Sequence, residues 1–472
     1  MGITETNVQK RLKKPAKKGK KVIIGAISSL CILTGIYFGG AAYFAKHFYY
    51  GSEINGVKVS GKSLEKVNEL MATHLNTYTL TLKERGNKTE QIKADEIGLQ
   101  YKSDGDFKIY KDNQNPYKWI FSFFSTEASK ITEEIKYDTQ LLMERVDKLA
   151  CLDSKNIVEP KNAGFKNGDN SFSVVDEVMG NKVDKDVLLK HVSEAVLKNE
   201  TTIDLEAVNS YINPEYTVNS SKVKETKSLL DKYTSSKITY TFGSSKETLD
   251  ASTISKWITV NEKYEVKLDE AKARAYVDSL AQKYNTVGKT RSFQTSTGKR
   301  IGIGRGDYGW AINRPKETTA LIEAIKAGQT AEKEPTYSRT ALAYGSNDIG
   351  NTYVEIDMAK QHLWFYKNGR LVTEGDVVTG NISKGNGTPT GVYMLKYKDK
   401  DATLNGEDYS TPVTYWMPFN GNVGIHDATW RNKFGGEIYK TKGSHGCINS
   451  PYQLAKAIFE NIKPGTPVIC YY

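Results

Sequence analysis

The stretch Ser444-His445-Gly446-Cys447-Ile448-Asn449 decides how the C-terminal part of this chain folds and works, and His426 lies 21 residues before its cysteine. The 472-residue chain has only six histidines and four cysteines, so two histidines near one cysteine stand out from the background. A free thiol with a pKa of about 8.5 is mostly protonated at neutral pH, and an imidazole that takes its proton makes it a nucleophile. The pattern therefore predicts a cysteine nucleophile with a histidine base.

The other residues of the hexapeptide suit the same chemistry. Gly446 has no Cβ, so its backbone can approach a substrate closely and offer N–H groups to an oxyanion. Ser444 and Asn449 carry short polar side chains that can orient an imidazole or hold the loop. His445 is two residues from the cysteine and is a second candidate for the base, whereas His426 must be brought in by the fold.

Two other interpretations of the cysteine stay open at this point. One is a buried structural cysteine near unrelated histidines. The other is a zinc site formed by His426, Asp427, His445 and Cys447, all of which are competent ligands. The paired Cys-x-x-Cys or His-x(3–5)-His spacing of common zinc sites does not occur here, so we expect no metal.

His426 followed by Ser444-His445-Gly446-Cys447-Ile448-Asn449 resembles the signature of the L,D-transpeptidases, bacterial enzymes of the YkuD type that cross-link peptidoglycan. Many relatives have glycine directly after the first histidine, where this chain has Asp427, so the role of Asp427 stays open. The resemblance implies that Cys447 is the nucleophile and His426 its general base, while His445 shapes the site.

The resemblance also implies the reaction. Cys447 would attack the carbonyl of the third residue of a donor tetrapeptide stem, release the terminal D-alanine and form a thioester. An amine of a neighbouring stem would then take the acyl group. No cofactor is expected, and carbapenem β-lactams are expected covalent inhibitors.

Residues 341–472 are expected to form this catalytic domain as a mainly-β fold, a β-sandwich with short helices. Asn351 to Met358 alternates apolar and polar residues as a half-buried strand does, and Lys367 to Arg370 is a turn signal inside a hairpin. An amphipathic helix is predicted over Pro451 to Asn461. Three aromatic residues are candidates for lining a substrate groove, with core packing as the alternative: Tyr415, Trp416 and Trp430.

Residues 22–45 carry no charge and would span about 36 Å as a helix, enough for a hydrocarbon core of about 30 Å. Residues 1–21 hold eight Lys and Arg against one acid, so we expect a single-pass membrane protein with a cytoplasmic N-terminus and its bulk outside. A cleaved signal peptide is the alternative. The net charge of +11 falls to +4 without this segment, which argues against a nucleic-acid partner.

Two copies of one α+β unit are expected between anchor and catalytic domain, over 51–215 and 216–340. Thr77-Tyr78-Thr79-Leu80 is echoed by Thr239-Tyr240-Thr241-Phe242, and each copy resembles the peptidoglycan-binding repeat found before such catalytic domains in Gram-positive bacteria. The repeats either bind the wall or only space the catalytic domain from the membrane. The sequence is thus expected to be multidomain, with a transmembrane helix, two α+β repeats and a catalytic domain.

Rival functions remain. The same thioester passed to water would make the chain a peptidoglycan L,D-carboxypeptidase or endopeptidase. A non-catalytic wall-binding anchor is a second alternative, and a sortase is a third, although a sortase cysteine does not lie in a Ser-His-Gly-Cys context. The sequence also leaves open whether Cys151 and Cys470 pair.

Overall fold

A computed structural model describes residues 18–102, 107–124, 130–131, 134–406 and 410–472. The chain divides into two compact units, each described by itself below. The first contains Met1–Asn162 and Glu177–Glu215, and the second contains Ala163–Asp176 and Tyr216–Tyr472. Most of the predicted basic segment, residues 1–17, lies outside the described residues.

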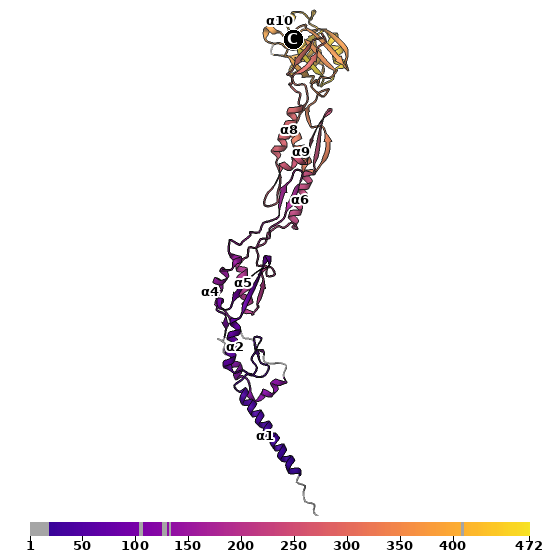
Figure 1. Ribbon diagram of the computed structural model, residues 1–472. Coiled ribbons are helices and arrows are strands. Elements are labelled where there is room, and N and C mark those ends of the chain that lie inside the picture. The colour runs from indigo at the N-terminus through magenta and orange to yellow at the C-terminus, as the bar shows by residue number, and fades with distance from the viewer. Residues whose placement is uncertain (1–17, 103–106, 125–129, 132–133, 407–409) are drawn as a thin grey trace, which may run out of the picture. The chain divides into compact units, whose positions relative to one another are not determined.

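The N-terminal helix α1 (Lys18–Phe44) is one uninterrupted helix in Figure 1. Its stretch Val22–Phe44 is long and apolar enough to cross a membrane, and no other helix among the described residues passes this test. Side chains 22–36 are exposed, whereas Ala41 and Phe44 in the last turn are buried. The end of α1 is therefore packed into the first unit.

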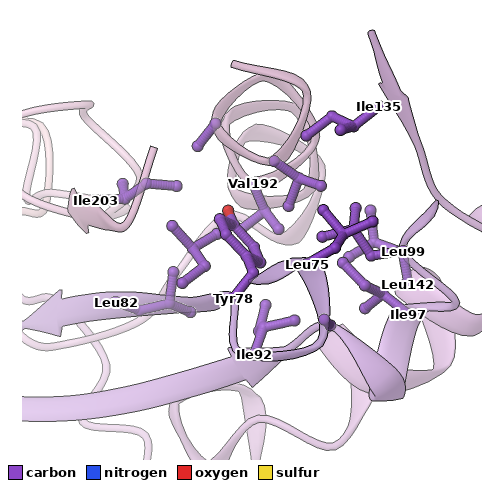
Figure 2. Packing of buried hydrophobic residues seen from close by; sticks show 14 of the residues in the cluster. Leu75, Tyr78, Leu82, Ile92, Ile97, Leu99, Ile135, Leu142, Val192 and Ile203 are labelled. Atoms are coloured by element: carbon purple, nitrogen blue, oxygen red, sulfur yellow. The ribbon is translucent and has the colours of Figure 1, made fainter. Parts of the chain in front are cut away.

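The remaining elements of the first unit are β1 (Glu53–Ile54), β2 (Val57–Lys58), α2 (Leu64–Asn76), β3 (Thr79–Glu84), η1 (Arg85–Asn87), β4 (Lys88–Lys93), η2 (Asp95–Ile97), β5 (Gln100–Tyr101), α3 (Lys108–Asp112), η3 (Pro116–Phe123), β6 (Lys130–Ile131), β7 (Ile135–Lys136), α4 (Thr139–Asp147), η4 (Ala150–Leu152), α5 (Lys185–Leu197) and β10 (Thr202–Asp204). Strand β3 pairs antiparallel with β4 and parallel with β10. Figure 2 shows the core between this sheet and the helices, where Leu75 of α2, Leu82 of β3 and Val192 of α5 lie together. Asp138 and Asp184 start α4 and α5 by accepting hydrogen bonds from backbone N–H groups of the first turn.

The second unit begins with β8 (Gly164–Asn167), β9 (Phe172–Val175), α6 (Ser221–Thr234), β11 (Lys237–Phe242), β12 (Ser245–Leu249), α7 (Ala251–Ile254), η5 (Ser255–Trp257), β13 (Ile258–Val260), β14 (Val266–Leu268), α8 (Glu270–Tyr284), β15 (Arg291–Gln294), β16 (Arg300–Ile303), β17 (Ala311–Ile312), α9 (Arg314–Ala327), β18 (Thr330–Lys333) and β19 (Tyr337–Arg339). Strand β11 pairs antiparallel with β12 and parallel with β18, the same connections that β3 makes with β4 and β10. Figure 1 labels α6, α8 and α9 in this part.

The hairpin β8–β9 belongs to the second unit although it comes before the end of the first. Phe172 is buried in the core that Leu230 of α6 and Leu321 of α9 share, and Phe165 packs against the same core. The hairpin lies within the predicted 51–215 repeat and packs against residues of the second unit, while the repeat boundaries themselves stay a prediction.

The C-terminal part is rich in strands, as predicted. It contains β20 (Tyr353–Asp357), β21 (His362–Lys367), β22 (Arg370–Asp376), η6 (Ile382–Lys384), β23 (Gly391–Met394), β24 (Asp399–Asn405), β25 (Ser410–Asn420), β26 (Val423–Asp427), α10 (Ile438–Lys442), β27 (Ile448–Ser450), α11 (Tyr452–Asn461) and β28 (Pro467–Tyr471). One sheet has the order β22-β21-β20-β28-β23 and the other β24-β25-β26-β27. The two sheets and α11 share one hydrophobic core. It contains Ile356 of the first sheet, Met417 of the second sheet and Ile458 of α11.

A second hairpin, β15–β16, packs against this strand-rich part. Phe293 and Ile303 of the hairpin are buried with Val392 and Ile469. Arg291 at the start of β15 forms a fully buried ion pair with Asp348. The guanidinium also donates to backbone carbonyls, including that of Tyr308, so its charge is well compensated.

Candidate active site

The pairing of two strands brings the predicted cysteine and histidine to one cavity. Strands β26 and β27 run parallel, with His426 opposite Asn449. Cys447 directly precedes β27, so the register that sets Asn449 beside His426 also brings the residue before the strand close to this part of the sheet. Both Cys447 and His426 line one cavity of about 390 Å³. Residues far apart in the chain therefore meet at a single site.

His426 is held in a defined tautomer. Its side chain is buried, and Nδ1 lies 2.8 Å from the carbonyl oxygen of Asp427. A carbonyl can only accept, so Nδ1 carries the proton and the neutral ring has its lone pair on Nε2. Burial lowers the pKa of His426 below its usual value, although the Asp427 carbonyl and charge act in the opposite direction. The imidazole is thus kept neutral and able to accept a proton.

The Cys447 thiol is also kept neutral at rest. It is buried beside Val413 and Trp416, and its Sγ donates to the carbonyl of Asn422 over 3.3 Å. Burial raises the pKa of Cys447 to about 11, with a hydrogen bond from the Gly424 backbone opposing it. The resting pair is therefore a thiol and a neutral imidazole, and we do not expect a preformed thiolate and imidazolium.

Ser444 organises the loop before the cysteine. Its Oγ donates to the carbonyl of Cys447 over 2.5 Å and accepts from the N–H of Gly446 over 3.1 Å. Gly446 has a φ of 125°, which L side chains rarely adopt, and its carbonyl accepts from Thr388 Oγ1 over 2.7 Å. The N–H of Gly446, which the sequence predicts to face an oxyanion, is thus hydrogen-bonded to Ser444.

The three candidate groove aromatics are divided between two environments. Trp430 lines the cavity, is 50% exposed, and has its ring 5.8 Å from that of His426. Trp416 is buried beside Cys447, with its ring 6.0 Å from that of His426. Tyr415 points away from the cavity into the core, where its ring packs against Phe459. Neighbours along a strand face opposite sides, so of the adjacent pair Tyr415 and Trp416 only Trp416 faces the site.

Asp427 and His445 differ from the rest of the motif. The Asp427 carboxylate is buried and accepts from the N–H of Tyr415 over 2.7 Å, so it holds β25 against β26. The hydrogen bond that the His426 ring donates is accepted by the backbone carbonyl of Asp427. His445 is exposed and lines the cavity with Ser444 and Asn449.

Sequence reasoning did not single out four further residues of the cavity lining: Leu404, Thr411, Arg431 and Gly443. Arg431 is the most informative of them because it brings a cation to the site. Its Nη2 donates to the carbonyl of Lys442 over 3.0 Å, while its buried Nε has no hydrogen-bond partner in the described part of the chain. Burial lowers the pKa of the guanidinium from its usual value. In the sequence, Arg431 follows Trp430 directly and lies five residues after His426, and this proximity is the signal that could have marked it as a site residue.

Known proteins similar to this chain contain the same kind of catalytic domain. Residues 351–470 match the model of the family described as the L,D-transpeptidase catalytic domain, YkuD. An L,D-transpeptidase from Enterococcus faecium, solved as a cysteine-to-serine mutant, is 35% identical and covers 53% of this chain and 100% of its own, with a TM-score of 0.44. The chain belongs to the L,D-transpeptidase family. As the sequence predicts, it is a peptidoglycan L,D-transpeptidase.

Other matches of this L,D-transpeptidase extend along the chain. Residues 90–204 and 216–333 each match the model of a family described as a candidate peptidoglycan-binding domain. The avibactam carbamoyl enzyme of Ldtfm is 36% identical and covers 53% of this chain and 99% of its own, with a TM-score of 0.44. The E. faecium catalytic domain acylated by ertapenem is 44% identical, covering 26% of this chain and 98% of its own, with a TM-score of 0.24. A search of curated proteins gives no significant match.

Proposed function

We propose that this L,D-transpeptidase works through a thioester on Cys447. The thiol attacks the carbonyl of the third residue of a donor tetrapeptide, a bond forms between Sγ and that carbon, and the bond to the terminal D-alanine nitrogen breaks. An amine of an acceptor stem then attacks the thioester, forms the new amide and restores the thiol. The observation that carries the proposal is the cavity that Cys447 and His426 line together.

His426 moves the proton in both halves of this reaction. In the first half its Nε2 lone pair takes the thiol proton as Sγ attacks, and the imidazolium gives that proton to the leaving amine of D-alanine. In the second half Nε2 takes a proton from the attacking acceptor amine and returns it to the departing Sγ, which restores the thiol. The Asp427 carbonyl, which fixes Nδ1–H, also stabilises the imidazolium that forms transiently. His445 is a site-shaping residue, and Asn449 lies beside His426 in the strand register.

Arg431 fits the free carboxylate at the end of the donor stem. A tetrapeptide donor ends in the carboxylate of its D-alanine, which must lie within a few ångströms of the bond that breaks. Arg431 lines the same cavity and has an unpartnered Nε, which makes it the natural partner for this anion.

The membrane and wall context completes the proposal. Residues 22–45 anchor the chain in the membrane, with the N-terminus in the cytoplasm and the catalytic part facing the wall. Burial of Ala41 and Phe44 in the first unit supports a retained helix over a cleaved signal peptide. The parts over 51–215 and 216–340 act as two copies of one unit, which the shared connectivity of β3 and β11 supports. The shared core of the two C-terminal sheets supports a β-sandwich.

The Ldtfm enzyme carries an avibactam carbamoyl adduct and the E. faecium catalytic domain is acylated by ertapenem, and we extend acylation by carbapenems to Cys447 of this chain.

The test is mass spectrometry of the products that the purified full chain makes from a disaccharide-tetrapeptide. Dimers that have lost one D-alanine support transpeptidation. Tripeptide monomers alone would instead establish the hydrolytic alternative, an L,D-carboxypeptidase. Binding of the muropeptide with no turnover would establish the non-catalytic wall anchor.

A further inference from the structure

A short segment of the first unit exposes an unusual number of large apolar side chains. In η3 and the residue after it these side chains are 40 to 83% exposed, and we call them the aromatic patch: Tyr117, Ile120, Phe121, Phe123 and Phe124. No residue of η3 is buried. Apolar surface in water costs about 25 cal/mol per Å², so a patch of this density indicates a surface that another apolar phase covers.

The patch is fixed to α1 by the one η3 aromatic outside it, Trp119. Its indole stacks on Phe44 with ring centroids 5.6 Å apart, and its Nε1 donates to the carbonyl of Tyr37 over 3.0 Å. Gly40 lies against the same ring, since a Cβ there would be 2.3 Å from the indole. The hydroxyl of Tyr37 donates in turn to the carbonyl of Tyr117 over 2.8 Å. Segment η3 is therefore docked on the last two turns of α1.

The chain before η3 is held at the same level. The side chain of Gln114 accepts from the N–H of Tyr49 and donates to the carbonyl of His47, and the hydroxyl of Tyr49 donates to the carbonyl of Asn115. These contacts join η3 to the residues that leave α1. The position of the aromatic patch is thus set by the helix end and not by a loose loop.

This position corresponds to the outer boundary of the proposed membrane span. Tyr37 to Phe44 are the last residues of the span, and at 1.5 Å per residue they cover about 10 Å along the helix axis. Tyr and Trp gather at this depth, and amphipathic segments bury their apolar faces there. Phe38 of α1, itself 55% exposed, contacts the ring of Tyr117, so the patch continues the lipid-facing surface of α1.

We propose that the aromatic patch inserts into the outer leaflet of the phospholipid bilayer beside α1. It makes a second membrane contact, which fixes the orientation of the first unit on the lipid surface. This inference rests on the proposed membrane span of α1. A lipid occupant is favoured over a protein because the patch is continuous with a helix surface that itself requires lipid.

The experiment uses the full chain in vesicles of phosphatidylglycerol and cardiolipin, with and without acyl-brominated lipid, which quenches nearby tryptophan. Phe121→Trp adds a probe to the patch, and Leu197→Trp adds a matched probe at an exposed position of α5 in the same unit. Difference spectra against the parent chain remove the emission of its six tryptophans. We expect brominated lipid to lower the emission added by F121W about twofold or more and to leave that of L197W unchanged.

Four results would overturn the inference or separate it from the proposed anchor. Emission of F121W that iodide in the buffer quenches as strongly as that of L197W would show a patch in water. Emission protected from both iodide and brominated lipid would show a protein occupant, a second copy included. If the chain is extracted from the vesicles at alkaline pH, the proposal that α1 spans the membrane is itself refuted. A chain that stays in the vesicles with F121W unquenched contradicts only the insertion of the patch.

Discussion

The imidazole of His426 stacks against the indole of Trp430, with ring centroids 5.8 Å apart and planes inclined by 28°. Trp430 lines the cavity beside the histidine, so its stacked ring covers part of the imidazole on the cavity side. This contact contributes to the burial that lowers the pKa of His426. The lowered pKa of His426 should therefore set the pH below which the reaction slows.

We predict that Trp430→Ala shifts the acid limb of kcat/KM to higher pH. In the proposed mechanism neutral His426 is the base, so activity should be lost as the pH falls through its pKa, which burial holds below the ordinary value of about 6.5. Exposing the ring lets the pKa rise toward that value. Rates measured between pH 4.5 and pH 8 check this, and Trp430→Phe, which keeps a stacked ring, should retain the parent profile. An unchanged acid limb in Trp430→Ala would contradict the shielding role.

We predict that a carbapenem adds its mass to the full chain once and that Cys447→Ala removes the adduct. Cys470→Ala is the matched control, because Cys470 is a free thiol buried in the core away from the cavity. It should leave the adduct in place. Intact-mass spectrometry reads the result directly, and an adduct that persists in Cys447→Ala would refute the nucleophile.

The sequence predicts the family and activity because the hexapeptide and His426 form a specific local pattern, and both predictions are confirmed. Other features depend on strand register and long-range packing, which no local pattern specifies. The alternation in β25 predicts that Tyr415 and Trp416 face opposite sides, but only the pairing with β26 determines that Trp416 faces the cysteine. The role of Asp427 also depends on strand pairing, because its carboxylate accepts a hydrogen bond from Tyr415 of the neighbouring strand β25.

The fold shows the same limit. The N-terminal helix and the strand-rich C-terminal part follow from apolar runs and alternation. The packing of Phe172 into the core of the second unit does not, because an isolated hairpin sequence carries no information about which core it joins. Arg431 was missed for a related reason, since a single arginine after a strand is normally solvated.

We predict that Arg431→Gln raises KM for a tetrapeptide donor about 10-fold or more, because one charge-assisted contact to the terminal carboxylate is lost. Arg431→Lys keeps the charge, so its KM should lie between that of the parent chain and that of Arg431→Gln. A donor whose terminal carboxylate is amidated provides the control, since it should be equally poor for the parent and for Arg431→Gln. If Arg431→Gln lowers kcat/KM by the same factor for both donors, the residue does not read the carboxylate.

We predict that Ser444→Ala lowers kcat about 10-fold or more while KM changes little, because the hydroxyl bridges the Cys447 carbonyl and the Gly446 N–H and so fixes the nucleophile. Ser444→Thr keeps the hydroxyl and should recover much of the rate. Ser383→Ala removes a comparable hydroxyl that bonds Asn381 outside the cavity lining, and it should leave kcat unchanged. Equal losses in Ser444→Ala and Ser444→Thr would contradict the positioning role.

The buried pair of Arg291 and Asp348 should matter for stability and not for chemistry. Both side chains are essentially fully buried, so Asp348→Asn leaves a buried cation uncompensated and should cost about 3–5 kcal/mol of unfolding free energy. The exposed pair of Arg314 and Asp278 is the control, and Asp278→Asn should cost less than about 1 kcal/mol. Chemical denaturation followed by tryptophan fluorescence measures both. Because Arg291 lies in the hairpin that packs on Val392 and Ile469, Asp348→Asn should also loosen that contact, which hydrogen exchange of β15 and β16 would reveal. Equal destabilisation by the two substitutions would mean that the buried pair is screened by solvent in the folded protein.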